Sequence, residues 1–335
     1  MAEGPGVASL REVREPVPGE GEVVVAVKAA LTCGTDLKLL RRGHPKLPFP
    51  LVLGHELAGV VSAAGEGAPF SPGERVACGV TGPCGECGEC RRGLENLCAT
   101  AFDAPAWGAF AERARIPARV VARSLLRIPD SLPFEAAALL DPVASVLRGL
   151  ARLPLEGAPD VLVRGSGPIA LIFASLLGRR GAGRVLVAAR RRERFPLFAE
   201  AGAELLDASS GGLGAALLGR TSGRGVDAVV DTTGEPSLVA ESLELAARGG
   251  TLLLFAGMPR DATVALSSYR VHYDEVTVSG SFHYRPADAR EALDLLAAGD
   301  LPVGRLVTDR RPLREWAEAF DALARGEGMK TALVP

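Results

Sequence analysis

The sequence predicts an α/β protein of two domains, one of which contains a doubly wound parallel sheet. Three observations support this prediction. The 335 residues exceed the usual size of one domain. Strand patterns fill the first third of the chain. Strand and helix patterns then alternate between about residues 160 and 280, as βαβ units do.

The first third has an all-β pattern with insertions. Alternating and β-branched runs predict strands within residues 21–30, 51–63 and 73–80. Glycines and prolines separate these runs, as they do in turns. We therefore expect a β-rich domain here.

From residue 160 onwards short apolar runs alternate with helical patterns. Strands are predicted at 160–164, 184–189, 225–231, 250–256 and 276–279, with helices at 169–177, 195–203 and 238–247. Strands that alternate with helices in this way are typical of a parallel sheet. The chain then continues with predicted helices at 287–298 and 313–324 and a strand at 331–334.

Composition argues against several kinds of partner. The net charge is −2, and no long run of one sign occurs, so neither a nucleic acid nor a membrane surface is an expected partner. No apolar stretch reaches 18 residues, and the first 21 residues lack the apolar core of a secretory signal. We expect a cytoplasmic protein, where clustered cysteines indicate metal binding more than disulfides.

Four cysteines form the strongest local motif. Cys84, Cys87, Cys90 and Cys98 follow the spacing C-x2-C-x2-C-x7-C. Four thiolates close a tetrahedral zinc site with no open position, so the predicted role is structural, in a lobe of about residues 80–100. Two disulfides would require an oxidising compartment. The bacterial iron–sulfur spacing places its fourth cysteine after three residues and before proline, unlike this chain.

A second group could hold a catalytic metal. Cys33 lies in the segment CGTD, and His55 and Glu56 lie in GHE. Catalytic zinc needs protein ligands and one open position, and thiolate and imidazole are suitable ligands. The third ligand could be Asp141, in LLDP, or Glu56. From spacing alone, residues such as Cys33 and His55 are more often structural than metal ligands.

A glycine turn predicts a dinucleotide site. The segment GSGPIA follows the strand at 160–164 and opens a helix, and its cofactor-binding candidates are Gly165, Gly167, Pro168 and Ile169. Glycines at these positions allow close approach of a pyrophosphate, and a helix N-terminus favours its negative charge. The strand–turn–helix context strengthens an otherwise weak motif.

The end of the second strand predicts the cofactor. Binding of NAD usually involves an acidic residue there, which hydrogen-bonds the ribose. This chain has Ala189, followed by Arg190 and Arg191. Arginines would accept the 2′-phosphate of NADP through charge-assisted hydrogen bonds, so we expect NADP, with NAD as the alternative. Arg194 is expected to belong only to a solvated helix start.

Together these motifs resemble the zinc-containing medium-chain dehydrogenase/reductase family over nearly the whole chain. The matching segments are CGTD (33–36), LGHELAGVV (53–61), GERV (73–76), the four-cysteine loop, GAFAER (108–113), LLDP (139–142) and GSGPIA (165–170). The resemblance implies a GroES-like catalytic domain from residues 1–141 and 283–335. It also implies a Rossmann domain from residues 142–282, with the active site in the cleft.

The resemblance further implies roles for single residues. Cys33 and His55 would be zinc ligands, with Asp141 or the exchangeable Glu56 completing the site. Asp36 would orient His55, Thr35 would hydrogen-bond the substrate oxygen and start the proton relay, and Lys330 would contact the cofactor pyrophosphate. The relay histidine of liver-type alcohol dehydrogenases is replaced by Lys38, and their cysteine at position 141 is replaced by aspartate.

With an acidic residue at position 141, the chain is most similar to the polyol, sugar-alcohol and threonine dehydrogenase branch of the family. The implied reaction is hydride transfer between a secondary alcohol of polyol, sugar or amino-alcohol type and NADP, with two zinc ions per chain, in a homodimer or homotetramer. The alternatives are an NAD-dependent dehydrogenase of simple alcohols and a non-catalytic NADPH-binding relative. Trp107 is predicted either near the substrate or as a surface or core aromatic, and Cys78 is predicted in a buried strand.

Overall fold

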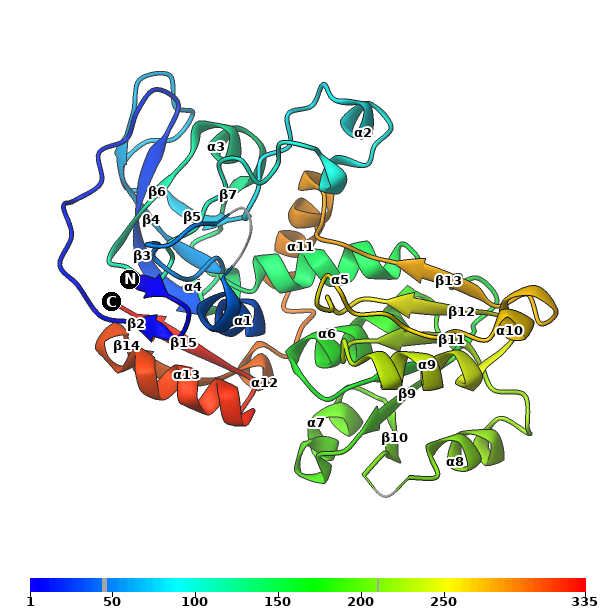
Figure 1. The fold of residues 1–335 in the computed structure, drawn as a ribbon. Coiled ribbons are helices and arrows are strands. Elements are labelled where there is room, and N and C mark those ends of the chain that lie inside the picture. The colour runs from blue at the N-terminus through cyan, green and yellow to red at the C-terminus, as the bar shows by residue number, and fades with distance from the viewer. Residues whose placement is uncertain (44–46, 210) are drawn as a thin grey trace. The chain divides into compact units, whose positions relative to one another are not determined.

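Residues 1–43, 47–209 and 211–335 are described by a computed structural model, in which the chain divides into two units (Figure 1). Unit 1 comprises Met1–Ser145 and His283–Pro335, and unit 2 comprises Val146–Phe282. The chain passes from unit 1 to unit 2 within helix α5 (Leu140–Leu150). Unit 1 is thus assembled from both ends of the sequence.

Unit 2 is built on a parallel sheet of six strands among its described residues, in the order β10-β9-β8-β11-β12-β13. Every neighbouring pair runs parallel. The strands are β8 (Asp160–Arg164), β9 (Arg184–Ala189), β10 (Glu204–Asp207), β11 (Val226–Asp231), β12 (Ala246–Leu254) and β13 (Thr277–Gly280). The order reverses beside the first strand, which confirms the predicted doubly wound sheet.

Helices connect the strands of unit 2. They are α6 (Pro168–Leu177), α7 (Phe195–Glu200), α8 (Leu213–Arg220), α9 (Pro236–Leu245) and α10 (Ser268–His272), with 3-10 turns η2 (Gly178–Arg180) and η3 (Arg192–Arg194). Leucines and valines of the sheet pack against α8 and α9 in one buried cluster. Strand β10 and helix α8 are absent from the sequence prediction, because the four-residue strand has acidic residues at both ends and no clear period.

Unit 1 contains a mostly antiparallel sheet, in the order β14-β15-β3-β4-β5-β7, with β6 also paired to β3. Its strands are β3 (Val23–Leu31), β4 (Leu57–Ala64), β5 (Arg75–Cys78), β6 (Arg113–Ile116), β7 (Leu125–Arg127), β14 (Val307–Pro312) and β15 (Lys330–Val334); β1 (Ala2–Gly4) and β2 (Val7–Ala8) form a separate hairpin. Strand β15 pairs antiparallel with β3, so the end of the chain completes the sheet begun near its start.

The helices of unit 1 surround this sheet in short segments. They are α1 (Gly34–Arg42), α2 (Gly88–Arg91), α3 (Ala118–Ser124), α4 (Phe134–Ala137), α11 (Pro286–Ala297), α12 (Val303–Leu306) and α13 (Trp316–Arg325), with 3-10 turns η1 (Glu95–Leu97) and η4 (Leu313–Glu315). Cys78 ends β5 and is buried, as predicted. None of the described helices has the length and apolar character needed to cross a lipid bilayer.

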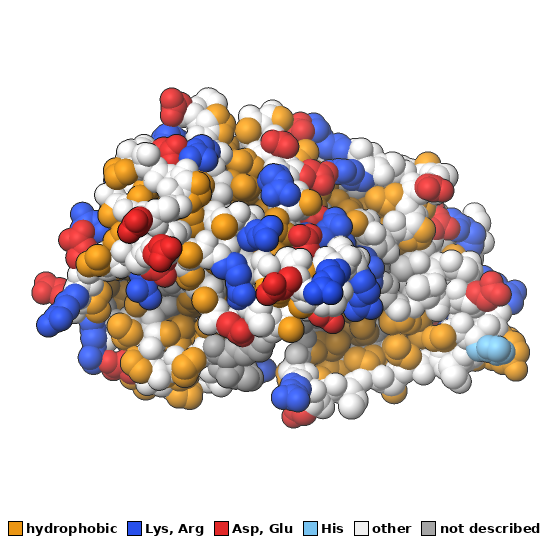
Figure 2. Space-filling view, turned by 90° about the horizontal axis from the view of Figure 1, so that it is seen from above, with side chains coloured by type: hydrophobic (Ala, Val, Ile, Leu, Met, Phe, Trp, Pro, Cys, Tyr) orange, Lys and Arg blue, Asp and Glu red, His pale blue; other side chains and the backbone are white. Residues whose placement is uncertain are grey.

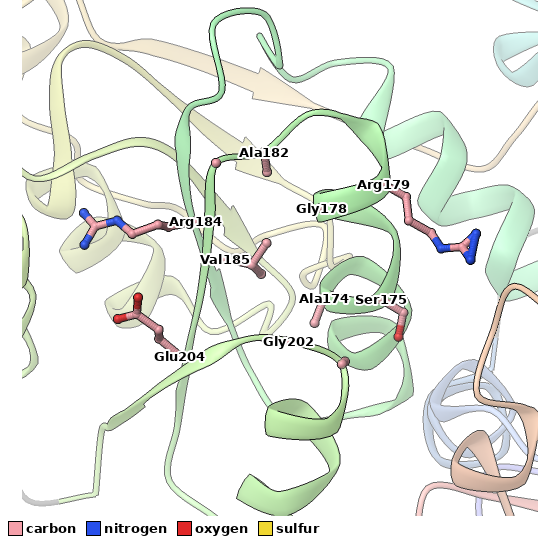
Figure 3. A pocket seen from close by; sticks show the side chains of 11 residues that line it. Ala174, Ser175, Gly178, Arg179, Ala182, Arg184, Val185, Gly202 and Glu204 are labelled. Atoms are coloured by element: carbon pink, nitrogen blue, oxygen red, sulfur yellow. The ribbon is translucent and has the colours of Figure 1, made fainter.

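The surface shows mixed charge and, in unit 2, a hollow. On the face drawn in Figure 2, positive and negative side chains are interspersed with hydrophobic ones. Figure 3 shows a hollow of about 440 Å³ in unit 2, at the amino ends of β9 and β10. Two of its charged side chains, Arg184 and Glu204, have ion-pair partners, Asp160 and Arg220.

Candidate functional site

Cys84, Cys87, Cys90 and Cys98 converge in the loop that carries α2 and η1. Their four sulfur atoms lie within 4.8 Å of one another, although no disulfide joins them. The Sγ atom of Cys84 is 3.9 Å from that of Cys90 and 3.6 Å from that of Cys98. Sulfurs bound to zinc at about 2.3 Å in a tetrahedron lie about 3.8 Å apart, so this donor set fits a structural zinc ion.

Backbone amides prepare these sulfurs for metal binding. The amide of Cys87 donates to Sγ of Cys84, and the amide of Cys84 donates to Sγ of Cys98, each at 3.3 Å. Hydrogen bonds from the amides of Glu86 and Cys87 lower the pKa of Cys84 to about 6. Because a thiol must lose its proton to bind a metal, the loop favours the metal-binding form.

A second group of donors lies in unit 1 beside helix α1. One ligand atom each from Cys33, His55 and Glu56 lie within 4.8 Å of one another. Cys33 precedes α1, and His55 and Glu56 precede β4, so the sheet brings two chain segments together here. A thiol, an imidazole and a carboxylate are the donor types of a catalytic zinc site, and three of them leave a fourth position open.

Asp36 fixes the orientation of His55. One carboxylate oxygen of Asp36 lies 3.0 Å from Nδ1 of His55 and accepts from the amide of Gly54 at 3.1 Å; the other accepts from the amide of Cys33 at 3.2 Å. Asp36 is fully buried. With Nδ1–H directed at Asp36, Nε2 of His55 is available for a metal.

Trp107 packs on the ring of His55. The two ring centroids are 4.6 Å apart and the planes are inclined by 20°. From the sequence, Trp107 is predicted either near the substrate or as a surface or core aromatic. The structure places it against a predicted ligand, so His55 is restrained on one face by Trp107 and at its edge by Asp36.

Lys330 forms a buried ion pair with Glu56. Its Nζ lies 2.7 Å from both carboxylate oxygens and donates to the carbonyl of Thr32 at 3.2 Å. The side chains of Lys330 and Glu56 are only 4% and 1% exposed. These three acceptors match the three hydrogens of the ammonium group. The contact of Lys330 with the cofactor pyrophosphate stays a prediction. Its ion pair with Glu56 was not predicted from the sequence.

The charges around Cys33 favour its thiolate. Burial opposes ionisation, but Lys330 and His55 together lower the pKa of Cys33 to about 6. Burial also raises the pKa of Glu56, and the neighbouring ammonium of Lys330 opposes that shift. Although burial favours neutral imidazole, Asp36 raises the pKa of His55 well above its usual value.

Asp141 lies outside the group of three donors that come within 4.8 Å of one another. Its Oδ1 accepts a hydrogen bond of 2.7 Å from the hydroxyl of Tyr284. Burial raises the pKa of Asp141 to about 6, and the charge of His55 opposes this effect while that of Glu56 adds to it. Tyr284 itself was not identified from the sequence, because nothing local links it to a residue 143 positions away.

The two glycines of the turn in unit 2 have different surroundings. Gly165 has a φ of +124°, and a Cβ there would come within 2.3 Å of the hydroxyl of Thr232. At Gly167 a Cβ would meet no atom within 4 Å, so packing does not demand glycine there. A position that is open on the protein side fits the close approach of a pyrophosphate to the start of α6, which has Pro168 at its first turn.

A hollow of about 340 Å³ adjoins this turn. Gly165, Gly167, Ala189, Arg190 and Arg191 are among the residues that line it. The hollow lies at the carboxyl ends of β8 and β9, where open parallel sheets bind their ligands. Pro168 and Ile169 follow in the first turn of α6.

The neighbouring arginines have distinct partners. Arg192 pairs with Asp207 at the end of β10, so its guanidinium is already engaged. Arg194 donates to the carbonyl of Ser166 at 2.6 Å, which corrects the expectation of a merely solvated residue. Arg194 braces the glycine turn across 28 residues, a contact that no local pattern encodes.

Thr35 lies in the first turn of α1, two residues after Cys33, and is exposed. The structure thus places Cys33, His55 and Glu56 together in unit 1. The predicted cofactor residues lie in unit 2, apart from Lys330. Asp36, Trp107 and Tyr284 complete the surroundings of the metal-ligand candidates.

Comparison with known protein families gives two matches. Residues 19–130 match the model of the alcohol dehydrogenase GroES-like domain, and residues 168–298 match that of the zinc-binding dehydrogenases. The chain is 32% identical to D-altritol 5-dehydrogenase of Agrobacterium fabrum, over 94% of this chain and 92% of that protein. It is 30% identical to D-arabinitol dehydrogenase 1 of Uromyces fabae, over 99% of this chain and 95% of that one.

Solved structures agree with these matches. A protein of Sinorhizobium meliloti 1021, described as a zinc-binding dehydrogenase bound to NADP, superposes with a TM-score of 0.90 at 31% identity; the match covers 100% of this chain and 98% of that one. A protein of E. coli CFT073 in complex with NADH gives a TM-score of 0.88 at 27% identity, over 100% and 98% of the two chains. The predicted combination of GroES-like and Rossmann-type domains is confirmed.

Proposed function

Because the chain belongs to the zinc-containing medium-chain dehydrogenase/reductase family, and is thus an NAD(P)-dependent oxidoreductase, we propose that it oxidises a polyol-type secondary alcohol with NADP. Sugars and amino alcohols belong to the same proposed substrate class. The observation that carries the proposal is the convergence of Cys33, His55 and Glu56 in unit 1.

Different residues of unit 1 would bind the metal, orient its ligands and transfer the proton. Cys33, His55 and Glu56 would hold zinc, with Asp141 beside them as the alternative third ligand. When bound, zinc supplies a Lewis acid and NADP supplies the hydride acceptor. Asp36, which lies 3.0 Å from Nδ1 of His55, would leave Nε2 free to bind zinc. Thr35 Oγ1 would accept the proton of the substrate hydroxyl and pass it to solvent.

The polyol class is supported by the two relatives named above, whose names specify sugar alcohols. The NADP preference is supported by Arg190 and Arg191, which line the hollow at the glycine turn where an acidic ribose partner would otherwise stand. Cys84, Cys87, Cys90 and Cys98 would hold the second zinc ion.

The test is a screen of NADP- and NAD-linked oxidation of polyols, sugars, amino alcohols and simple alcohols. The expected result is the highest kcat/KM with NADP and a polyol-type substrate, and two zinc ions per chain. A Cys33→Ser variant should bind cofactor but lose nearly all turnover. Better efficiency with NAD would overturn the cofactor assignment, and one zinc ion per wild-type chain would favour a non-catalytic cofactor-binding protein.

We also infer that the chain self-associates in the cytoplasm, as a homodimer or homotetramer. Large hydrophobic side chains are exposed on α10 at Tyr269, just after it at Tyr273, and on the edge strand β13 at Val278. A sheet edge with exposed hydrophobic side chains beside it is a site for pairing with another chain. Light scattering should give a mass of two or four chains, and a monomer at micromolar concentration would contradict this.

A further inference from the structure

The hydroxyl group of Tyr284 lies between a backbone donor and a carboxylate acceptor. The amide of Val80 donates to Oη of Tyr284 at 2.9 Å, and Oη donates to Oδ1 of Asp141 at 2.7 Å. Tyr284 is only 3% exposed. A phenol has one hydrogen to donate. Because the amide of Val80 already supplies a hydrogen to the oxygen, the phenol hydrogen is left for Asp141.

The backbone around this hydroxyl leaves it little freedom. A Cβ added at Gly79 would come within 3.0 Å of the Cβ of Ser124 and 3.2 Å of Oη, so the phenol is closely packed at the end of β5. The preceding residue, His283, adopts a left-handed φ of 54° and its Nε2 lies 2.6 Å from Oγ1 of Thr81. A non-glycine residue held there indicates a segment fixed by its surroundings.

The hydrogen bond from Tyr284 restricts the orientation of the Asp141 carboxylate. With Oδ1 engaged by Tyr284, the carboxylate can present Oδ2 to a second partner. The charges of His55 and Glu56 act on this carboxylate, so Asp141 belongs to the electrostatic surroundings of the metal-ligand candidates. We propose that Tyr284 is a positioning residue, whose hydroxyl holds Asp141 in the orientation that the catalytic metal site needs. This inference rests on the proposed function.

A purely structural role for Tyr284 makes a different prediction. The contacts of residues 283 and 284 with Val80 and Thr81 join two segments of unit 1. In a purely structural role, loss of the hydroxyl would destabilise this junction whether or not Asp141 is present. The two roles are separated by a double-mutant cycle, because residues that act through one another are not additive.

The experiment compares wild type, Tyr284→Phe, Asp141→Asn and the double variant. Ser62→Ala is the control, because it removes a hydroxyl that donates to the carbonyl of Val24 in unit 1 and belongs to neither donor group. The first readout is the affinity of the chelator-labile zinc, identified by its absence from Cys33→Ser. The second is kcat and KM for alcohol and cofactor. Thermal unfolding and NADPH fluorescence check that each variant folds.

Tyr284→Phe should weaken the labile zinc about tenfold or more, as removal of a partner behind a metal ligand typically does. It should lower kcat while leaving the KM for the cofactor within twofold of wild type. In the Asp141→Asn background the same change should alter zinc affinity less than twofold.

Two results would overturn the inference. One is wild-type zinc affinity and kcat in Tyr284→Phe, and the other is an equal loss with and without Asp141. Both concern the variants, whereas the proposed function fails in the wild type, through absent alcohol oxidation or a single zinc ion per chain. The two failures are therefore distinguishable.

Discussion

The ammonium group of Lys330 lies 2.7 Å from both carboxylate oxygens of Glu56, although 274 residues separate them. The pair joins the start of β15 to the segment before β4 and is almost wholly buried. A pair buried in this way binds a predicted metal ligand to the strand that completes the sheet of unit 1.

Lys330→Met should destabilise unit 1 strongly. Removing one partner of a buried ion pair leaves an uncompensated charge, which costs about 3–5 kcal/mol. The measurement is urea unfolding at pH 7. In the double variant Lys330→Met/Glu56→Gln no charge is left unpaired, so more than half of the loss should be recovered. Unfolding of Lys330→Met at the wild-type urea concentration would contradict the prediction.

Removing both Arg190 and Arg191 should weaken NADP selectively. Hydrogen bonds from arginine to phosphate contribute about 1.5–3 kcal/mol each, so Arg190→Ala/Arg191→Ala should raise the KM for NADP at least tenfold. The KM for NAD should change little, because NAD lacks the 2′-phosphate. Steady-state kinetics with both cofactors gives the answer. Arg192→Ala is the control, since its partner is Asp207; equal effects on NADP and NAD would refute the assignment.

Cys87→Ser should remove one zinc ion and loosen its loop. Three thiolates cannot close a tetrahedral structural site as four do. We expect one zinc ion per chain by mass spectrometry and new proteolytic cleavage between residues 84 and 98. Cys78→Ala, which changes a buried cysteine outside both donor groups, should retain two zinc ions. Retention of two zinc ions by Cys87→Ser would exclude the cluster as a four-thiolate site.

Asp36→Asn should weaken the labile zinc without unfolding the protein. The amide keeps the size of Asp36 but loses the charge that orients His55, and such changes typically cost 10–100-fold in metal affinity. Chelator competition measures the effect. Asp207→Asn, the same change in unit 2, should leave zinc affinity unaltered. An unchanged affinity in Asp36→Asn would show that Trp107 alone suffices to orient the imidazole.

The carboxylate of Asp160 should stabilise unit 2 only above acidic pH. Its hydrogen bonds with Arg184, at 2.9 Å to Nε, lower its pKa below the ordinary value of 3.8. A lowered pKa means that the stabilisation is present above pH 3.8 and is lost as the pH falls through the folded value. Asp160→Asn should cost about 1 kcal/mol at pH 7, with the gap to wild type closing below pH 3.8. Urea unfolding against pH tests this.

The control for this titration is Asp130→Asn, whose carboxylate is fully exposed. It should shift stability far less than Asp160→Asn at pH 7. A pH-independent difference between wild type and Asp160→Asn would mean that the side chain acts through packing and not through its charge.

Local spacing explains which parts of the site were predictable. The four cysteines of the loop lie within 15 residues, so one short segment almost determines their convergence. The glycine turn is similarly local, since strand, turn and helix are consecutive. By contrast, the partners Glu56 and Lys330, and Asp141 and Tyr284, meet only through the sheet and helices of unit 1. Sequence periodicity carries no information about such pairs.

The same limit applies to the fold. Long apolar strands such as β8 and β9 match their predicted bounds, because burial on both faces gives a continuous apolar run. Strand β10 is four residues long and pairs with β9 alone, so its sequence needs no such run. Its place in the sheet is fixed by tertiary packing, which outweighs local propensity.

The pairing of β15 with β3 also sets an order of events during synthesis. All strands of unit 2 have been synthesised once residue 280 is made, whereas the sheet of unit 1 still lacks β14 until residue 312 and β15 until residue 334. Domains generally fold as units while the chain is still being made. A released chain truncated near residue 300 would therefore contain every strand of the unit 2 sheet but neither β14 nor β15 of the unit 1 sheet. Glu56 would lack its ion-pair partner until Lys330 is made, so the metal-ligand group would be the last part of the molecule to reach its final structure.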